Sequence, residues 1–286
     1  MDKDALFSVV GLFDIRESVN DVRPLGAGLI NDTYLVETAS GPRYVLQSIN
    51  NAVFTDVELL QHNIEAVTGH IRAKIVAAGE TDPDRKVLRY IPLKTDPRTY
   101  CEVDGNFWRL SVFVNDSVTL NEVNPSTSYA TGRAFGQFEC MLADLQEPLG
   151  ETIPDFHNME LRSRQLREAV ASDRAGRVHD PEIQHILGVL AEYDAEMCKA
   201  ERMHRDGVLP KRICHCDPKV NNILFDADGS ILCVIDLDTV MPSFVFSDFG
   251  DFLRTGANTV AEDCPETDKV AFRMDIFEAF AKGYLE

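Results

Sequence analysis

Residues 215–222 read HCDPKVNN and combine histidine, aspartate and asparagine in one short stretch. Within it, His215 and Asp217 form a His-x-Asp motif, and Asn222 follows after four intervening residues. These residue types also fit a surface turn, because aspartate and asparagine favour turn conformations. The stretch alone therefore leaves a catalytic loop and a surface turn equally open, and the flanking sequence has to separate them.

The sequence that follows predicts a short β-hairpin. Apolar runs occupy 222–225 and 231–235, and the residues between them, DADGS, favour a turn. Asp236 stands at the end of the second run. A loop followed by a hairpin can bring Asp217, Asn222 and Asp236 to one cleft, so the flanking sequence favours a catalytic loop.

Three polar side chains in one cleft suit phosphoryl transfer to a hydroxyl group. That reaction needs a carboxylate that orients the attacking O–H and accepts its proton, and it needs oxygen ligands for the Mg²⁺ that bridges the phosphates. We predict that Asp217 is the catalytic base and that Asn222 and Asp236 are ligands of Mg²⁺. His215 is expected to brace the loop through hydrogen bonds.

The whole chain predicts an α+β fold with two lobes. Residues 1–114 are rich in strand patterns and form the predicted N-lobe, residues 115–286 are rich in helical patterns and form the predicted C-lobe, and 112–118 connect them. In the N-lobe we expect strands at 34–37, 43–49, 87–91, 100–103 and 107–114. In the C-lobe we expect helices from the apolar stripes in 130–145, 183–197 and 270–281.

One helix interrupts the strands of the N-lobe. Val57, Leu60, Ile64, Val67 and Ile71 recur at steps of three and four and form a single apolar stripe. Thr55, followed three residues later by Glu58, predicts a capping box at the start of this helix.

Composition limits the classes of partner. The chain has 286 residues and a formal net charge of −19, which argues against nucleic acid and anionic membranes as partners. No apolar run is long enough to span a membrane, and residues 1–10 fit neither a secretory signal nor a transit peptide. The seven cysteines lack the spacing of a disulfide framework, which predicts a cytoplasmic protein.

Several stretches together resemble a known family. They read GAGLINDTY at 26–34, YVLQSIN at 44–50, IPDFHN at 153–158, DPKVNN at 217–222 and IDLDT at 235–239. The chain resembles the aminoglycoside phosphotransferase and choline kinase superfamily over nearly its whole length, and within it the N-acetylhexosamine 1-kinase branch. The resemblance implies a bilobal protein-kinase-like fold. It also implies transfer of the γ-phosphate of ATP to the anomeric hydroxyl of N-acetylglucosamine or N-acetylgalactosamine, with Mg²⁺ as cofactor.

The resemblance places the nucleotide in the N-lobe. Gly26 and Gly28 are expected to bring a loop close to the phosphates, although such a pair also fits an ordinary turn. Gln47 stands where a kinase normally has the lysine that holds the α- and β-phosphates. Val114, in the connector, is the fourth residue that we expect at the nucleotide.

The acceptor is expected at the edge of the same cleft. The resemblance assigns Asn31, Asp32 and His157 to the acceptor, together with the base Asp217. For His157, a loop-structuring role is the alternative. The partners expected from the sequence are thus ATP and a small hydroxylated acceptor, an amino sugar.

Two further aspartates are expected to support the site. Asp248-Phe249-Gly250 spells the metal-binding motif of protein kinases, but Asp236 already occupies that position after the hairpin, so we predict that Asp248 caps a helix or braces a loop. Asp238 is either a second metal ligand or a surface carboxylate. A zinc site built on Cys214, His215 and Cys216 is disfavoured, because no further ligands follow at short spacing.

Alternative functions remain at this point. A kinase for choline, homoserine or an aminoglycoside would use the same residues, and an acidic surface suits cationic acceptors. A nucleotide-binding module without catalysis is suggested by Gln47 and opposed by the complete set of Asp217, Asn222 and Asp236. The helical pattern still continues at 284–286, so a fragment or a short member of the family is also expected.

Overall fold

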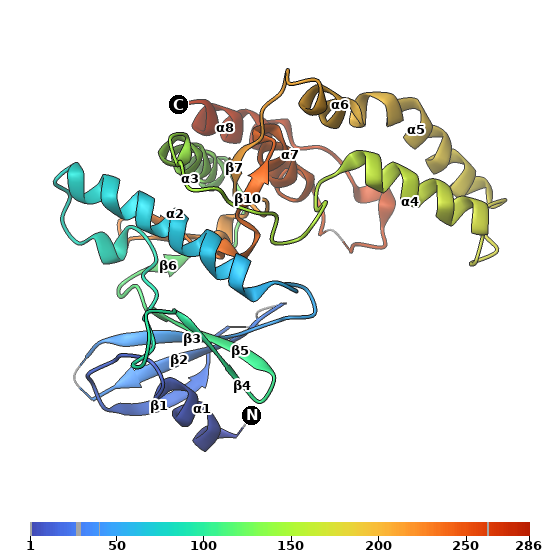
Figure 1. Ribbon diagram of the computed structural model, residues 1–286. Coiled ribbons are helices and arrows are strands. Elements are labelled where there is room, and N and C mark those ends of the chain that lie inside the picture. Colours follow the sequence, from blue (N-terminus) through green and yellow to red (C-terminus); the bar gives the residue numbers. More distant parts are fainter. Residues whose placement is uncertain (1, 27–29, 40, 262) are drawn as a thin grey trace.

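The computed structural model describes residues 2–26, 30–39, 41–261 and 263–286. It contains a lobe built on a β-sheet and a lobe built mainly of helices (Figure 1), so the α+β fold with two lobes is confirmed. The domain limits at residue 114 stay a prediction. Within the described residues, no helix is both long enough and apolar enough to cross a membrane.

The sheet lobe is a five-stranded antiparallel sheet. Its order in space is β1 (Val19–Pro24), β2 (Asp32–Thr38), β3 (Arg43–Ile49), β5 (Asn106–Val112) and β4 (Tyr100–Val103). One face of the sheet buries Val36, Leu46 and Leu110 against α1 (Lys3–Val10), which supplies Leu6, Val9 and Val10 to the same core. The sequence analysis missed α1 and β1.

The predicted strand at 87–91 is wrong. Val87 and Ile91 are buried, as their apolar pattern suggests, but this segment makes only an isolated bridge, between Tyr90 and Ser111, and no ladder. A 3₁₀ turn, η1 (Pro83–Arg85), precedes it. The segment meets only the end of β5, because β4 already pairs with residues 106–109 of that edge, and the remainder packs as irregular chain.

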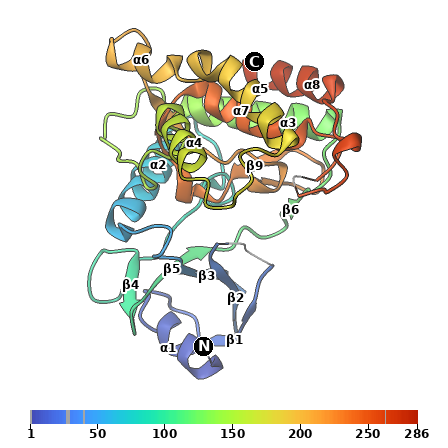
Figure 2. The same ribbon diagram turned by 90° about the vertical axis from the view of Figure 1, so that its right-hand side faces the viewer.

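Helix α2 (Val57–Ala77) lies between the sheet and the helices (Figure 2). Its predicted apolar stripe is buried, together with Phe138, Leu142 and Leu237 from the other lobe. The predicted capping box is wrong: the side chain of Asp56 accepts the N–H of Leu59, at 2.9 Å, and caps the helix. Helix α2 therefore connects the lobes through a shared core.

The helical lobe surrounds two small sheets. Its helices are α3 (Pro125–Leu142), α4 (Met159–Ser172), α5 (Pro181–Met197), α6 (Lys199–Arg205), α7 (Val245–Gly256) and α8 (Met274–Leu285). One small sheet has the order β6 (Val118–Thr119), β8 (Ile223–Phe225), β9 (Ile231–Val234), and the other pairs β7 (Arg212–Cys214) with β10 (Met241–Ser243). The predicted hairpin is thus present as β8 and β9. The sequence analysis missed β7 and β10, which are only three residues long.

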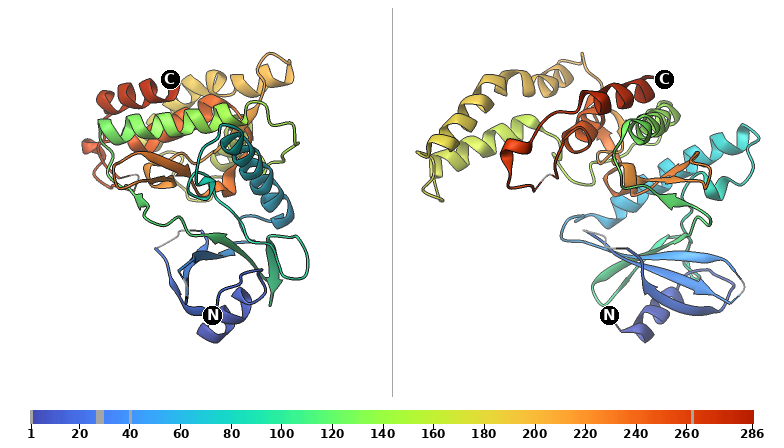
Figure 3. Two further views of the ribbon diagram at one scale, coloured as in Figure 1. Left: turned by 90° about the vertical axis from the view of Figure 1, so that its left-hand side faces the viewer. Right: turned by 180° about the vertical axis from the view of Figure 1, so that it is seen from behind.

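Helices α4 and α5 form a hairpin that extends away from the sheet lobe (Figure 3). Helix α5 contains the predicted range 183–197, but none of its described residues is buried. Ile186 and Tyr193 are 46% and 55% exposed. Its apolar stripe therefore does not contribute to the core that positions the site.

Helices α3 and α8 cross at very short range. A Cβ added to Gly132 would lie 2.2 Å from the carbonyl oxygen of Phe280, and one added to Gly283 would lie 2.1 Å from that of Tyr129. The face of α8 that meets α3 carries Ile276, Phe280 and Gly283. The predicted stripe through Val270 and Met274 is wrong, because both residues are more than half exposed and the close crossing selects the face that carries glycine.

We expect Gly132→Ala to destabilise the protein by about 2 kcal/mol or more, because the new methyl group would meet backbone atoms that cannot rotate away. Gly69→Ala in α2 is the matched control, since no atom lies within 4 Å of its added Cβ. That control should be neutral or stabilising by about 0.5–1 kcal/mol. Urea unfolding of both variants tests this, and equal stabilities would refute the close crossing.

Candidate active site

The loop after β7 is organised around His215, which is fully buried. Its Nε2 lies 2.9 Å from the carbonyl oxygen of Ile235, and its Nδ1 accepts the N–H of Asp217 at 3.3 Å. These partners select the tautomer with the proton on Nε2. Its ring meets those of Phe135 and Phe138 edge-on. The imidazole thus joins the loop of Asp217 to the residue that precedes Asp236.

Asp248, in the first turn of α7, holds the backbone of the same loop. Its two carboxylate oxygens accept the N–H groups of His215, at 2.7 Å, and Cys216, at 2.8 Å. Cys216 has a φ of 66°, a left-handed conformation that is costly for a side chain with a Cβ. The two hydrogen bonds offset that cost and fix the backbone immediately before Asp217.

Asp217, Asn222 and Asp236 lie in adjoining segments. The Nδ2 of Asn222 donates to the backbone oxygen of Asp217 at 2.9 Å and to its carboxylate at 3.4 Å. The backbone oxygen of Asn222 accepts the N–H of Ile235 at 2.9 Å. Asp236 follows in a left-handed conformation, with φ 60° and ψ 56°. The hairpin therefore carries the metal-ligand candidates back to the loop, as the sequence predicts.

The donor set fits Mg²⁺. Because Asn222 uses its Nδ2 toward Asp217, its Oδ1 is the atom that remains for a cation, and Asp236 adds a carboxylate. Partial removal from water and the negative charge of Asp238 raise the pKa of Asp236. A bound cation would relieve both effects, and Mg²⁺ prefers such hard oxygen ligands. The assignment of Asn222 and Asp236 as its ligands stays a prediction.

Lys219 is a site residue that the sequence analysis missed. Its Nζ lies 2.7 Å from one carboxylate oxygen of Asp217 and 3.0 Å from the other, and its side chain is 40% exposed. Its position two residues after the predicted base was the available signal. It brings a positive charge directly to the carboxylate of the predicted base.

A second missed residue, Arg109 on β5, joins the two lobes. Its Nη1 lies 2.6 Å from Oδ1 of Asp238, in an ion pair whose atoms lack the alignment of a hydrogen bond. Burial is the largest single effect and lowers the pKa of Arg109, but Asp238, Tyr90 and Asp236 together outweigh it and raise the pKa. A single arginine inside a strand gives no sequence pattern that would reveal such a contact.

Asn31 contacts the same carboxylate. Its Nδ2 lies 2.5 Å from Oδ2 of Asp238, and its Oδ1 accepts the N–H of Asn50. Both polar ends of Asn31 are thus engaged within the protein, and its assignment to the acceptor stays a prediction. Asp238 is 3% exposed, and its carboxylate is held by two side chains of the other lobe. It is therefore not a surface carboxylate, and the structure favours a supporting role over metal binding.

The remaining nucleotide candidates lie on or beside the sheet. The Oε1 of Gln47 accepts the Nε–H of Arg109 at 3.0 Å. Gly26, two residues after the end of β1, has a φ of 71°. Gly28 lies outside the described residues. Val114 is buried in the connector, and its carbonyl oxygen accepts the hydroxyl of Ser117 at 2.7 Å. The nucleotide roles of these residues stay predictions.

The acceptor candidates lie at two places. Asp32 is exposed at the start of β2. His157 precedes α4, where its ring stacks on Phe156 with a centroid distance of 4.5 Å and its buried Nδ1 has no hydrogen-bond partner in the described chain. Burial lowers the pKa of His157. Its ring and Cys216 line one pocket, which places it beside the catalytic loop.

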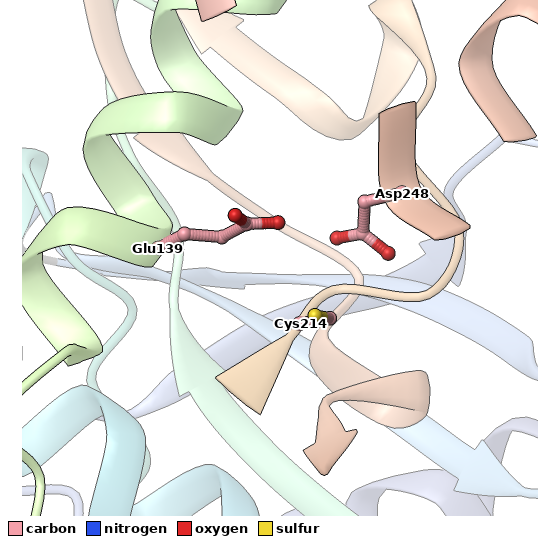
Figure 4. Close-up of side chains that lie close together, drawn as sticks. All are labelled: Glu139, Cys214 and Asp248. Atoms are coloured by element: carbon pink, nitrogen blue, oxygen red, sulfur yellow. The ribbon is translucent and has the colours of Figure 1, made fainter. Parts of the chain in front are cut away.

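A compact group of Glu139, Cys214 and Asp248 lies behind the loop, and Figure 4 shows the two carboxyl groups pointing at each other. Asp248 already accepts two N–H groups, and Glu139 accepts the hydroxyl of Tyr284 at 2.7 Å. Burial raises the pKa of the Cys214 thiol far above its usual range. These contacts favour a proton shared between two carboxyl groups over a metal ion.

The comparison with known proteins now decides the family. A family model described as "Phosphotransferase enzyme family" matches residues 21–284. The chain belongs to that phosphotransferase family. The predicted enzyme class, a phosphotransferase, is therefore confirmed. The resemblance to the superfamily is also confirmed, whereas the N-acetylhexosamine branch stays a prediction.

Solved structures of other phosphotransferases share the fold. The amicoumacin kinase hAmiN, solved with AMP-PNP, Ca²⁺ and Ami, is 13% identical with a TM-score of 0.63, over 100% of this chain and 78% of that chain. The spectinomycin phosphotransferase APH(9)-Ia, solved with ADP and spectinomycin, is 13% identical with a TM-score of 0.55, over 100% and 80%. An ethanolamine kinase from Plasmodium vivax is 15% identical with a TM-score of 0.51, over 93% and 67%. These similarities confirm the protein-kinase-like architecture of the family.

The pair of Glu139 and Asp248 predicts a pH dependence of stability. Burial and the facing carboxylate raise the pKa of Glu139, and burial raises that of Asp248. A carboxyl group whose pKa is raised by folding binds its proton more tightly in the native state. Its favourable contribution is therefore present at low pH and is lost as the pH rises above 4.5, the usual value for glutamate, through the raised pKa.

We expect Glu139→Gln to flatten this dependence, because the amide keeps a donor toward Asp248 without titrating. Between about pH 5 and pH 9 the free energy of unfolding of the unmodified protein should fall by on the order of 1–3 kcal/mol more than that of the variant. Chemical unfolding at several pH values measures this. Glu168→Gln, at an exposed position of α4, is the control. Parallel curves for Glu139→Gln and the unmodified protein would contradict the shared proton.

Proposed function

We propose that this phosphotransferase is an Mg²⁺-dependent sugar 1-kinase that transfers the γ-phosphate of ATP to the anomeric hydroxyl of an N-acetylhexosamine. The observation that carries the proposal is the environment of Asp217. This carboxylate is oriented by Asn222 and Lys219 in a loop that is anchored from behind by Asp248. The stretches at 26–34, 44–50 and 153–158 support the choice of amino sugar, because they resemble the N-acetylhexosamine 1-kinase branch.

The residues of the chain have distinct tasks in this reaction. Asp217 accepts a hydrogen bond from the sugar hydroxyl and so directs the hydroxyl oxygen at the γ-phosphorus. It takes the hydroxyl proton as the new P–O bond forms. The oxygen of the β-phosphate leaves with the electron pair of the broken P–O bond. Asn222 and Asp236 would hold Mg²⁺, which supplies positive charge to the β- and γ-phosphates when bound. Lys219 adds a fixed charge beside the transferred group.

A cationic acceptor is the second candidate. The pocket beside His157 is also lined by the carboxylates of Glu151, Asp155 and Glu201. One of these, Glu151, is already paired with Lys211. The remaining negative charge favours an amine, and two neighbours of similar fold are an ethanolamine kinase and a spectinomycin phosphotransferase. The same Asp217 chemistry would serve this acceptor.

The decisive experiment is an ADP-release assay with Mg·ATP against N-acetylglucosamine, N-acetylgalactosamine, glucose, choline, ethanolamine, homoserine and kanamycin. We expect release with an N-acetylhexosamine and a sugar 1-phosphate as the product in the ³¹P NMR spectrum. ADP release only with an amine-containing acceptor would overturn the sugar as acceptor and support the cationic acceptor. ATP binding without release for any acceptor would favour the non-catalytic module.

Asp217→Asn tests the mechanism with whichever acceptor is active. We expect kcat to fall by about 100-fold or more, because the amide cannot accept the proton, while the affinity for Mg·ATP changes little. Asp228→Asn is the matched control, since this aspartate caps the hairpin turn through Ser230, outside the site. An Asp217→Asn enzyme with the parental kcat would show that another group is the base.

A further inference from the structure

Strand β3 lacks the lysine that kinases normally carry there, and the neighbouring strand β5 carries a buried arginine. A kinase normally carries on its third strand the lysine that holds the α- and β-phosphates, and β3 has Gln47 there. Directly opposite Gln47 in the register of β3 and β5 stands Arg109. Its side chain is 2% exposed, although an arginine is rarely buried so completely. A buried arginine beside the substituted position needs a reason.

Arg109 is held from three directions. Its Nε–H donates to Oε1 of Gln47 at 3.0 Å, its Nη1 faces Asp238 at 2.6 Å, and its guanidinium lies 5.6 Å from the centre of the Tyr90 ring. Asp238 is two residues beyond the metal-ligand candidate Asp236. The arginine therefore contacts β3 in the sheet lobe and, in the helical lobe, the segment that carries Asp236.

The contact with Gln47 decides which way that amide points. Only Oε1 can accept the Nε–H of Arg109, because the opposite orientation would place two donors against each other. Nε2 is consequently directed to the other side, where it donates one of its two hydrogens to Oγ1 of Thr33 at 3.3 Å. The second hydrogen of this fixed amide is the donor that Gln47 can offer to a ligand on the side away from Arg109.

We propose that Arg109 is the positioning residue of the nucleotide site, which directs the Nε2 donor of Gln47 at the triphosphate and ties the Asp236 segment to the sheet through Asp238. Where other kinases place a charged lysine on the third strand, β3 carries an uncharged amide donor, and Arg109 of β5, itself paired with Asp238, holds that donor in place. This inference rests on the proposed function in that the triphosphate of ATP is the ligand.

The test compares Mg·ATP with adenosine, which lacks phosphates, by isothermal titration calorimetry. Arg109→Met should weaken Mg·ATP binding by about tenfold or more, the effect of one misdirected hydrogen bond, and leave adenosine binding unchanged. Gln47→Met should do the same, and it keeps the pair of Arg109 and Asp238 if the first variant is too unstable to purify. Arg23→Met is the matched control, because Arg23 forms an exposed ion pair with Glu37 on the same sheet.

A lysine at position 47 gives a sharper test. In the unmodified protein Gln47→Lys places a second cation beside Arg109 and should weaken Mg·ATP binding. In the Arg109→Met background the same change returns the charge to the third strand and should restore binding by at least half of the lost factor. A purely structural role of Arg109 would lower the melting temperature and weaken both ligands without any such rescue.

The outcomes separate this inference from the proposed function. An unmodified protein that binds no Mg·ATP overturns both. Normal binding by the unmodified protein, together with unchanged Mg·ATP affinity in Arg109→Met and Gln47→Met, overturns the positioning role alone. Equal losses for Mg·ATP and adenosine also overturn it. Failure of every acceptor in the ADP-release assay leaves these binding measurements, and the role of Arg109 that they test, intact.

Discussion

The buried carboxylate of Asp248 holds the catalytic loop, and the geometry of the site depends on it. The loop needs a left-handed residue at Cys216, and it has no regular secondary structure of its own to keep it there. A carboxylate that accepts two adjacent N–H groups supplies the missing partners. Asp248 in turn faces Glu139, which accepts the hydroxyl of Tyr284 on α8. The close crossing of α3 and α8 therefore supports the direction of the loop.

A second buried carboxylate, that of Asp238, couples the lobes. It forms an ion pair with Arg109 and accepts a hydrogen bond from Asn31, both in the sheet lobe. Asp236 lies two residues before it in the same segment. Replacing Arg109 would leave the charge of Asp238 uncompensated in the interior, which is far more costly than breaking a surface ion pair. The net charge of the chain, −19, repels an anionic nucleotide. Positively charged side chains held at the cleft are therefore needed to attract it.

Local sequence patterns predicted the strands and helices whose apolar residues follow one regular spacing or whose turn residues are diagnostic. The strand at 43–49 and the hairpin of β8 and β9 were correct because alternation and turn residues specify them. The stripe on α2 was correct because one face is buried along most of its length. The strand at 87–91 and the face of α8 failed, since apolar spacing shows that residues are buried but not what covers them. In the site, the motif pointed to Asp217, Asn222 and Asp236, which the structure brings together.

The sequence alone indicated the α+β fold and the phosphotransferase family, because both leave short stretches of residues that are close along the chain. It also predicted the catalytic motif from one such stretch. The tertiary structure was needed to show that Arg109 meets Gln47 and Asp238, and which backbone N–H group Asp248 accepts. These contacts join positions 33 to 129 residues apart. No local period encodes such pairs, since the partner of a buried charge is set by how strands and helices pack in three dimensions.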